Sequence, residues 1–191
     1  MKNTNAYILA GGKSSRMGTD KGLLLIEGKA MIQYVIEQMQ AVFSTVIIVS
    51  NNREYEKFGL KVIPDLIKDI GPAGGIYTSL KHSDAQLNFI VSCDMPLITK
   101  EAIEFIFKTR KESQIVLLKN QEILDPLFGL YSKDCETVWL QLIHQKIIKL
   151  QEMVLRFNLQ TIAVEDNIIF NQSFFKNINT KADFNNLLNL I

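Results

Sequence analysis

The sequence predicts an α/β protein of one domain, a three-layer sandwich around a mainly parallel, Rossmann-like central sheet. The first observation is that short apolar runs alternate, in the first half of the chain, with segments whose apolar residues recur at helical spacing. This alternation is typical of strand–helix–strand units, which build parallel sheets with right-handed crossovers. The second observation is the length of 191 residues, which suits a single domain.

The elements of the first half can be assigned in order. Strands are expected at residues 6–10, 45–49, 60–63 and 88–92, and helices at residues 31–42, 54–58 and 72–80 and from Thr99 onward. In the segment 31–42 the apolar residues Ile32, Val35 and Met39 recur at helical spacing, so one face of this helix is apolar. Thr99 is expected to cap the helix that follows it, because threonine is favoured at that position.

The second half is less regular but continues the same two patterns. Strands are expected at residues 114–118, 127–131 and 159–164, and helices at residues 135–144, 148–157 and 181–190. We interpret the change of pattern as an added part that extends the same sheet. No low-complexity linker separates the two halves, so a second domain is not expected.

The composition argues against several classes of protein. The formal net charge is +1, which argues against bulk electrostatic attraction to nucleic acid. The apolar run at residues 6–10 is too short for a signal-peptide core, and no apolar stretch reaches the length of a membrane span. Cys93 and Cys135 lie far apart, which favours two free thiols over a disulfide. We therefore expect a cytoplasmic protein with neither a nucleic-acid nor a membrane partner.

A glycine-rich loop follows the first expected strand and is a candidate anion site. Gly11 and Gly12 allow a sharp turn that brings backbone N–H groups near a ligand, and Arg16 and Lys21 supply positive charge. Backbone donors and cations in one loop suit a triphosphate. The spacing matches neither the Walker pattern nor the dinucleotide fingerprint. An ordinary glycine turn with solvated lysines is the alternative.

Polar segments follow three further expected strands. Ser50, Asn51 and Asn52 come after the second strand, Asp65 after the third, and Asp94 after the fourth. The carboxyl ends of parallel strands share one edge of a sheet, and ligands bind along that edge near the switch point of strand order. Each loop alone could be a polar cap on an apolar strand. Taken together with the glycine-rich loop, the segments predict one ligand-binding crevice.

Four motifs, in order along the chain, resemble those of one enzyme family. They are Leu9-Ala10-Gly11-Gly12 with Ser15-Arg16-Met17-Gly18 and Asp20-Lys21, then Gly71-Pro72-Ala73-Gly74-Gly75-Ile76, Cys93-Asp94-Met95-Pro96 and Asn177-Ile178-Asn179-Thr180. The first is similar to a signature of nucleotidyltransferases with a GT-A-like fold. More narrowly, the set resembles the molybdenum cofactor guanylyltransferases, the molybdopterin-guanine dinucleotide biosynthesis protein A family, and spans nearly the whole chain.

The resemblance implies a Mg²⁺-dependent enzyme that transfers GMP from GTP to the terminal phosphate of molybdopterin and releases pyrophosphate. Residues 1–98 would form a nucleotide-binding half and residues 99–191 an acceptor-facing half of one domain. Its substrates would be GTP and molybdopterin, with transient contacts to other molybdenum cofactor proteins. A terminal phosphate with a second pKa of about 6 is largely ionised at neutral pH, so no protein nucleophile is required.

The resemblance also implies roles for individual residues. GTP contacts are expected from Leu9, Ala10, Gly11, Gly12, Lys21, Asn52, Asp65 and Asp94, catalytic roles from Arg16, Lys21 and Asp94, and Mg²⁺ ligation from Asp94 and Asn179. Arg16 and Lys21 would neutralise the phosphates, and the Asp94 carboxylate would bind the hard cation. Structural roles are the alternatives, since Asp94 could cap a turn and Asn179 could cap the last helix.

Some residues depart from the family's pattern, and the roles of some others stay open. Alanine stands at position 30 where proline is usual, and either Asn51 or Asn52 could be the asparagine that contacts the nucleotide. The segment 71–75 could lie near the ligand or be a plain helix entry. His82 and His144 lie in no catalytic motif and are expected to be ordinary helix residues.

Three other functions share these motifs. They are a cytidylyltransferase acting on the same pterin, a nucleotidyltransferase acting on a sugar phosphate or polyol phosphate, and a non-catalytic nucleotide-binding subunit. Lys21 and Asp94 are both present, which favours an enzyme over the last of these. The choice of base depends on a few contacts in the crevice that the motifs do not specify.

Overall fold

The computed structural model describes residues 3–11, 20–165 and 169–170. The strands are β1 (Thr4–Leu9), β2 (Leu25–Ile26), β3 (Lys29–Ala30), β4 (Val46–Val49), β5 (Lys61–Ile63), β6 (Leu87–Ser92), β7 (Ile115–Asn120), β8 (Ile123–Ser132) and β9 (Leu159–Ala163). The α-helices are α1 (Met31–Val42), α2 (Pro72–His82), α3 (Lys100–Thr109), α4 (Glu136–His144) and α5 (Leu150–Val154). Three short 3₁₀ helices are η1 (Lys21–Leu23), η2 (Arg53–Phe58) and η3 (Lys133–Cys135).

Seven strands form one mainly parallel sheet, as predicted, in the order β5-β4-β1-β6-β8-β7-β9. β5, β4, β1 and β6 are parallel neighbours, and β7 pairs with β9 in parallel. β8 is antiparallel to both of its neighbours, β6 and β7. Because β8 runs the opposite way, its first residues lie at the edge where the parallel strands end.

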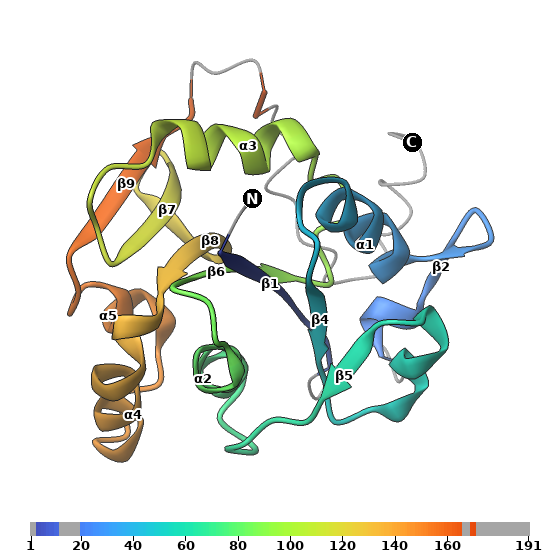
Figure 1. Ribbon diagram of the computed structural model, residues 1–191, viewed down its shortest axis with the longest axis horizontal. Helices are drawn as coiled ribbons and strands as arrows, with labels where there is room; N and C mark the ends of the chain where they lie inside the picture. The colour runs from blue at the N-terminus through green and yellow to red at the C-terminus, as the bar shows by residue number, and fades with distance from the viewer. Residues whose placement is uncertain (1–2, 12–19, 166–168, 171–191) are drawn as a thin grey trace.

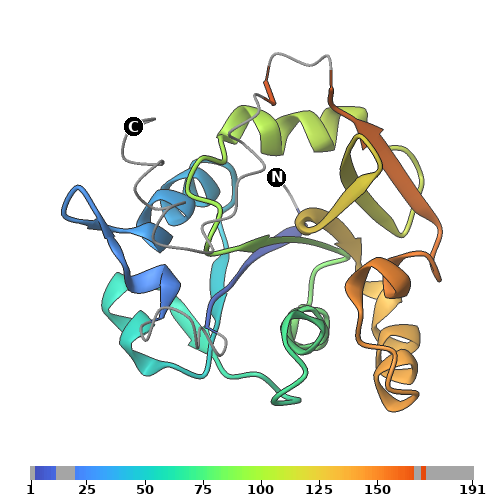
Figure 2. The same ribbon diagram turned by 180° about the vertical axis from the view of Figure 1, so that it is seen from behind.

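Helices cover both faces of the sheet and make the three predicted layers (Figure 1; Figure 2 from behind). The cluster that packs α1 and α3 on one face and the cluster that packs α2, α4 and α5 on the other are separate. Side chains alternate along each strand, so Ala6 and Ile8 of β1 enter the first cluster while Tyr7 and Leu9 enter the second. Strands buried on both faces explain the continuous apolar runs of the sequence.

The local predictions of helix positions are largely confirmed. The α1 helix spans Met31–Val42, and Thr99 caps α3 by accepting a hydrogen bond from the Ala102 N–H at 3.2 Å. Ala30 directly precedes α1. Its backbone N–H donates to the Gln33 side chain at 2.9 Å, so the helix start keeps a polar partner.

Other local features differ from the predictions or lie outside the described residues. The β2–β3 hairpin was not expected, and its turn residues Glu27 and Gly28 both have positive φ, at 49° and 81°. The helix expected at residues 148–157 covers only Leu150–Val154, and the one expected at residues 181–190 lies outside the described residues. Both cysteines are buried and free, as expected. None of the described helices is long and apolar enough to cross a membrane.

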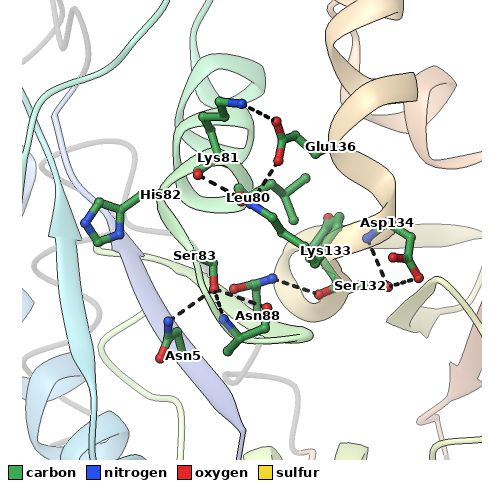
Figure 3. Close-up of polar contacts among 12 residues, drawn as sticks. Asn5, Leu80, Lys81, His82, Ser83, Asn88, Ser132, Lys133, Asp134 and Glu136 are labelled. Carbon is green, nitrogen blue, oxygen red and sulfur yellow. Dashed lines mark hydrogen bonds and ion pairs between the residues drawn. The ribbon is translucent and has the colours of Figure 1, made fainter.

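A group of polar contacts fixes the carboxyl end of α2 (Figure 3). The Lys133 ammonium, from η3, donates to the carbonyl oxygens of Leu80 at 2.5 Å and Lys81 at 3.3 Å, and it pairs with Glu136 at 2.8 Å. Glu136 also pairs with the Lys81 ammonium at 2.8 Å. The last carbonyls of a helix lack partners within it, so a cation there is stabilising. These contacts tie α2 to the start of α4.

We predict that Lys133→Met lowers the free energy of unfolding by about 1–2 kcal/mol, because it removes both the ion pair and the hydrogen bonds to the end of α2. Lys81→Met is the matched control, since Lys81 is more exposed and contributes only the ion pair with Glu136. Urea denaturation followed by circular dichroism compares the two variants. Equal losses of stability would contradict the role given to the helix-end contacts.

Candidate active site

A cleft of about 650 Å³ opens at the carboxyl edge of the sheet, beside the switch point between β1 and β6. It is lined by Leu9, Ala10, Gly11, Asp20, Val49, Ser50, Asn51, Asn52, Asp65, Ile67, Asp69, Gly71, Pro72, Gly75, Ser92 and Leu127. Five of the residues predicted to contact GTP are therefore brought together here. The volume is in the range of ordinary small-molecule sites.

The glycine at the end of β1 is required by the backbone. Gly11 has φ of +99°, and a Cβ atom there would lie 3.2 Å from the Ser50 hydroxyl oxygen. The strand before it is held on both sides, because the Ala10 N–H donates to the Val49 carbonyl and the Leu9 carbonyl accepts from the Cys93 N–H. The chain thus leaves the sheet at a fixed point, where Gly11 lines the cleft.

The two asparagines after β4 have different partners. Asn51 pairs with Asp65, donating to its carboxylate at 3.0 Å and accepting from its backbone N–H at 3.2 Å. Asn52 accepts from the Glu54 N–H at 3.0 Å and donates to the Asp20 carboxylate at 3.3 Å. Both asparagine side chains are therefore bonded to the protein on both of their polar groups. Asn51 fixes a carboxylate in the cleft, and Asn52 links the start of η2 to Asp20.

The Asp65 carboxyl group is partly removed from water. Burial raises its pKa above the ordinary value, and the hydrogen bond donated by Asn51 opposes that shift. A carboxylate held in this way at the rim of a cleft can accept hydrogen bonds from hydroxyl or N–H groups of a ligand.

Lys21 and Asp94 lie together next to the cleft, although neither is among its lining residues. The Lys21 ammonium is 3.7 Å from the Asp94 Oδ2 atom, and both side chains are largely buried. The Oδ1 atom of Asp94 is buried and has no hydrogen-bond partner among the described residues. A buried carboxylate oxygen without a donor is costly, so this atom is suited to a cation.

The Asp94 carboxylate fits a Mg²⁺ ion that is also bound by substrate. Magnesium is commonly held by one or two carboxylates together with phosphate oxygens. Within residues 3–11, 20–165 and 169–170, no group of three or more His, Cys, Asp or Glu side chains is placed to hold a metal. Asn179, the other predicted ligand, lies outside the described residues, as do Gly12 and Arg16.

The described residues near Asp94 offer no activated nucleophile. Burial raises the pKa of the Cys93 thiol far above its usual range, and the Asp94 and Asp20 carboxylates add to the shift, so the thiol is protonated at neutral pH. His82 lies in α2 and His144 in α4, away from Asp94, as expected of helix residues. The site is therefore built for binding and charge neutralisation.

The first turn of α2 opens on the cleft. Gly71 precedes the helix with φ of +62°, Pro72 begins it, and both line the cleft together with Gly75. A Cβ atom on Gly75 would lie 3.1 Å from the Leu9 side chain, so glycine lets the helix approach β1 closely. The segment is both a helix entry and a wall of the cleft.

Comparison with known proteins assigns the family. Residues 6–160 match the family model described as a MobA-like NTP transferase domain. The chain belongs to this family. The MobA-like NTP transferases are nucleotidyltransferase enzymes, which agrees with the resemblance seen in the four motifs.

Individual relatives cover the chain almost completely. A probable molybdenum cofactor guanylyltransferase of Flavobacterium johnsoniae is 34% identical over 98% of this chain and 97% of its own length. One of Clostridium perfringens is 33% identical over 98% of each chain. The crystal structure of molybdopterin-guanine dinucleotide biosynthesis protein A from Archaeoglobus fulgidus superposes with a TM-score of 0.83 at 25% identity, covering 97% of each chain.

Three acidic residues at this MobA-like site were not among the predicted site residues: Asp20 and Asp69, which line the cleft, and Asp125. Asp125 lies near the start of β8, which reaches the carboxyl edge because that strand is antiparallel. Burial raises its pKa to about 6, the Leu127 N–H opposes the shift, and the negative charge of Asp94 adds to it. The only sequence signal for Asp125 was its position before Pro126, and a residue pattern does not give the direction of a strand.

We predict that Asp125→Asn stabilises the metal-free protein at neutral pH. The pKa is about 6 in the folded state and 3.8 unfolded, so the folded state binds the proton more tightly. This favourable contribution is complete below pH 4 and lost as the pH rises through 6. In EDTA at pH 7.5 the variant should gain about 1–3 kcal/mol of unfolding free energy, and nothing at pH 3.5.

Asp84→Asn is the control for this experiment. A hydrogen bond from Asn5 lowers the pKa of Asp84, so its ionised form is favoured and its removal gives no gain at pH 7.5. Urea denaturation at both pH values provides the measurement. A gain for Asp125→Asn that is the same at both pH values would contradict the raised pKa.

Proposed function

We propose that this MobA-like NTP transferase transfers GMP from GTP to the terminal phosphate of molybdopterin, with Mg²⁺, to give molybdopterin guanine dinucleotide and pyrophosphate. The observation that carries the proposal is the Lys21–Asp94 pair, with its unpartnered buried carboxylate oxygen, next to the cleft. The names of the full-length relatives support this choice of nucleotide and acceptor.

The nucleoside would occupy the cleft between the ends of β1 and β4. The backbone of Leu9, Ala10 and Gly11 forms one wall, and the Asp65 carboxylate, held by Asn51, faces the same space. This carboxylate can accept hydrogen bonds from ribose hydroxyls or from guanine N–H groups. Asn52 lines the cleft as well and supports it by its bond to Asp20.

The triphosphate would extend from the cleft toward Lys21 and Asp94. Lys21 neutralises phosphate charge, and Gly12 and Arg16 of the glycine-rich loop are proposed to add backbone and guanidinium donors. Asp94, with Asn179 as the proposed second ligand, would hold Mg²⁺. When bound, the ion polarises a phosphate oxygen and stabilises the negative charge that develops in the reaction.

The chemistry requires little from the protein beyond position and charge. A terminal phosphate oxygen of the pterin attacks the α-phosphorus of GTP, a new P–O bond forms, and the bond to the β-phosphate breaks with loss of pyrophosphate. The attacking oxygen is already ionised at neutral pH, so no proton must be removed. Lys21 and the N–H groups lining the cleft would hold the two anions at reacting distance.

The direct test is to incubate the pure protein with molybdopterin and Mg²⁺ and each of GTP, CTP, ATP and UTP separately, and to measure pyrophosphate. We predict turnover with GTP. Turnover with CTP alone would contradict the guanylyl assignment and favour the cytidylyl alternative. No turnover with any of the four would contradict transfer to this pterin.

We predict that Asp94→Ala lowers turnover by at least about 1,000-fold while the protein stays folded, because the proposed metal ligand is lost. Asp84→Ala, which removes a carboxylate from the opposite edge of the sheet, should leave turnover within twofold of wild type. Pyrophosphate release gives the rates, and circular dichroism checks the fold. Activity that survives Asp94→Ala would remove this residue from the mechanism.

A further inference from the structure

A fully buried tyrosine contacts the two residues that flank Lys21 in the sequence. Tyr55, in η2, has no exposed surface, and its hydroxyl donates to the Asp20 Oδ1 atom at 2.5 Å. Burial raises the pKa of this phenol far above its usual range, so it remains a donor. The Asn52 side chain donates to the other oxygen of Asp20 at 3.3 Å. Both oxygens of Asp20 are therefore held by the segment that follows β4.

Gly22, the residue that follows Lys21, is held in place by packing. A Cβ atom on Gly22 would lie 2.5 Å from the Tyr55 hydroxyl oxygen and 3.2 Å from the Cys93 sulfur. The chain therefore passes directly between these two side chains. Tyr55 thus touches Gly22 and bonds Asp20, which are the two neighbours of Lys21 in the sequence.

The short helix η1 transmits this constraint to the backbone of Lys21. The Leu23 N–H donates to the Asp20 carbonyl at 3.1 Å, and the Leu24 N–H donates to the Lys21 carbonyl at 3.1 Å. A lysine side chain is flexible, so its ammonium group is well placed only when the backbone that carries it is held in position. Here the backbone is fixed on both sides, and the ammonium lies 3.7 Å from the Asp94 carboxylate.

We propose that Tyr55 and Asp20 are positioning residues, which set Lys21 for the phosphates of a bound nucleoside triphosphate. This inference rests on the proposed function in one respect, namely that Lys21 binds phosphate. Tyr55 is buried and does not line the cleft. Asp20 lines the cleft, but both of its oxygens already accept hydrogen bonds from the protein, so its role does not require contact with the ligand. Their effect reaches the substrate through Lys21, because small displacements of a binding group are costly.

The test measures the affinity for Mg²⁺ with inorganic triphosphate, and for Mg²⁺ with GTP, by calorimetry. Tyr55→Phe removes only the hydroxyl and is expected to weaken both affinities about tenfold. In the Lys21→Ala background, which is itself weakened, Tyr55→Phe should cause no further loss. Tyr7→Phe is the matched control, since it removes another buried tyrosine hydroxyl, bonded to His82 at the opposite edge. It should leave both affinities unchanged.

A second variant keeps the test decisive if Tyr55→Phe folds poorly. Asp20→Asn keeps the size of the side chain but replaces one acceptor oxygen with a donor, so it should reproduce the loss and its dependence on Lys21. A tenfold loss that persists in the Lys21→Ala background would show a general structural effect and overturn the proposal. Unchanged affinity in both variants, or no effect of Lys21→Ala itself, would overturn it as well.

The probes separate this inference from the proposed function. Inorganic triphosphate carries neither a base nor an acceptor, so its binding does not depend on guanine or molybdopterin. Triphosphate binding that depends on Lys21 and Tyr55, without guanylyl transfer, would support the positioning pair and contradict the proposed reaction. If the protein transfers GMP but Tyr55→Phe changes neither the rate of transfer nor the affinity for triphosphate, the proposed reaction would be supported and the positioning pair contradicted.

Discussion

The carboxylate of Asp94 places the strongest physical demand on this structure. One of its oxygens is buried without a hydrogen-bond donor among the described residues, and the other lies near the Lys21 ammonium at 3.7 Å. A buried charged group without full partners costs several kcal/mol unless a ligand supplies them. The surrounding fold tolerates this cost at a position where phosphate and a divalent cation would remove it.

The sheet explains why this carboxylate stands where a nucleotide could reach it. β1 connects to β4 on one side and β6 connects to β7 on the other, so the strand order reverses between β1 and β6 and their carboxyl ends form the switch point of the sheet. The end of β1 supplies backbone, the segment after β4 supplies Asn51 and Asn52, and the segment after β6 supplies Asp94. Helices on both faces keep these ends in register.

Much of this arrangement could be predicted because it depends on local patterns. The α1 helix follows from apolar residues at helical spacing, and all seven strands of the sheet follow from short apolar runs. The residues Leu9, Ala10, Gly11, Asn52 and Asp65 lie around one cleft because parallel strands end at the same edge. The role of each residue in catalysis stays a prediction, and Gly12, Arg16 and Asn179 lie outside the described residues.

Other features depend on information that a residue pattern does not contain. The direction of β8, which brings Asp125 to the site, is set by the packing of the sheet. The β2–β3 hairpin has strands too short for a periodicity, and its Glu27-Gly28 turn lacks the usual Asn-Gly signature. The bond from Tyr55 to Asp20 joins residues 35 apart, so only the folded chain shows it.

The proposed function requires that Asp94 holds a metal beside the phosphates of a nucleotide bound in the cleft. The most direct measurement is a crystal structure with GTP and Mn²⁺ as an anomalous stand-in for Mg²⁺. We predict an anomalous peak at coordination distance, about 2.1 Å, from an Asp94 oxygen, with the phosphates against Lys21. An ordered GTP whose manganese and phosphates lie away from Asp94 would contradict it.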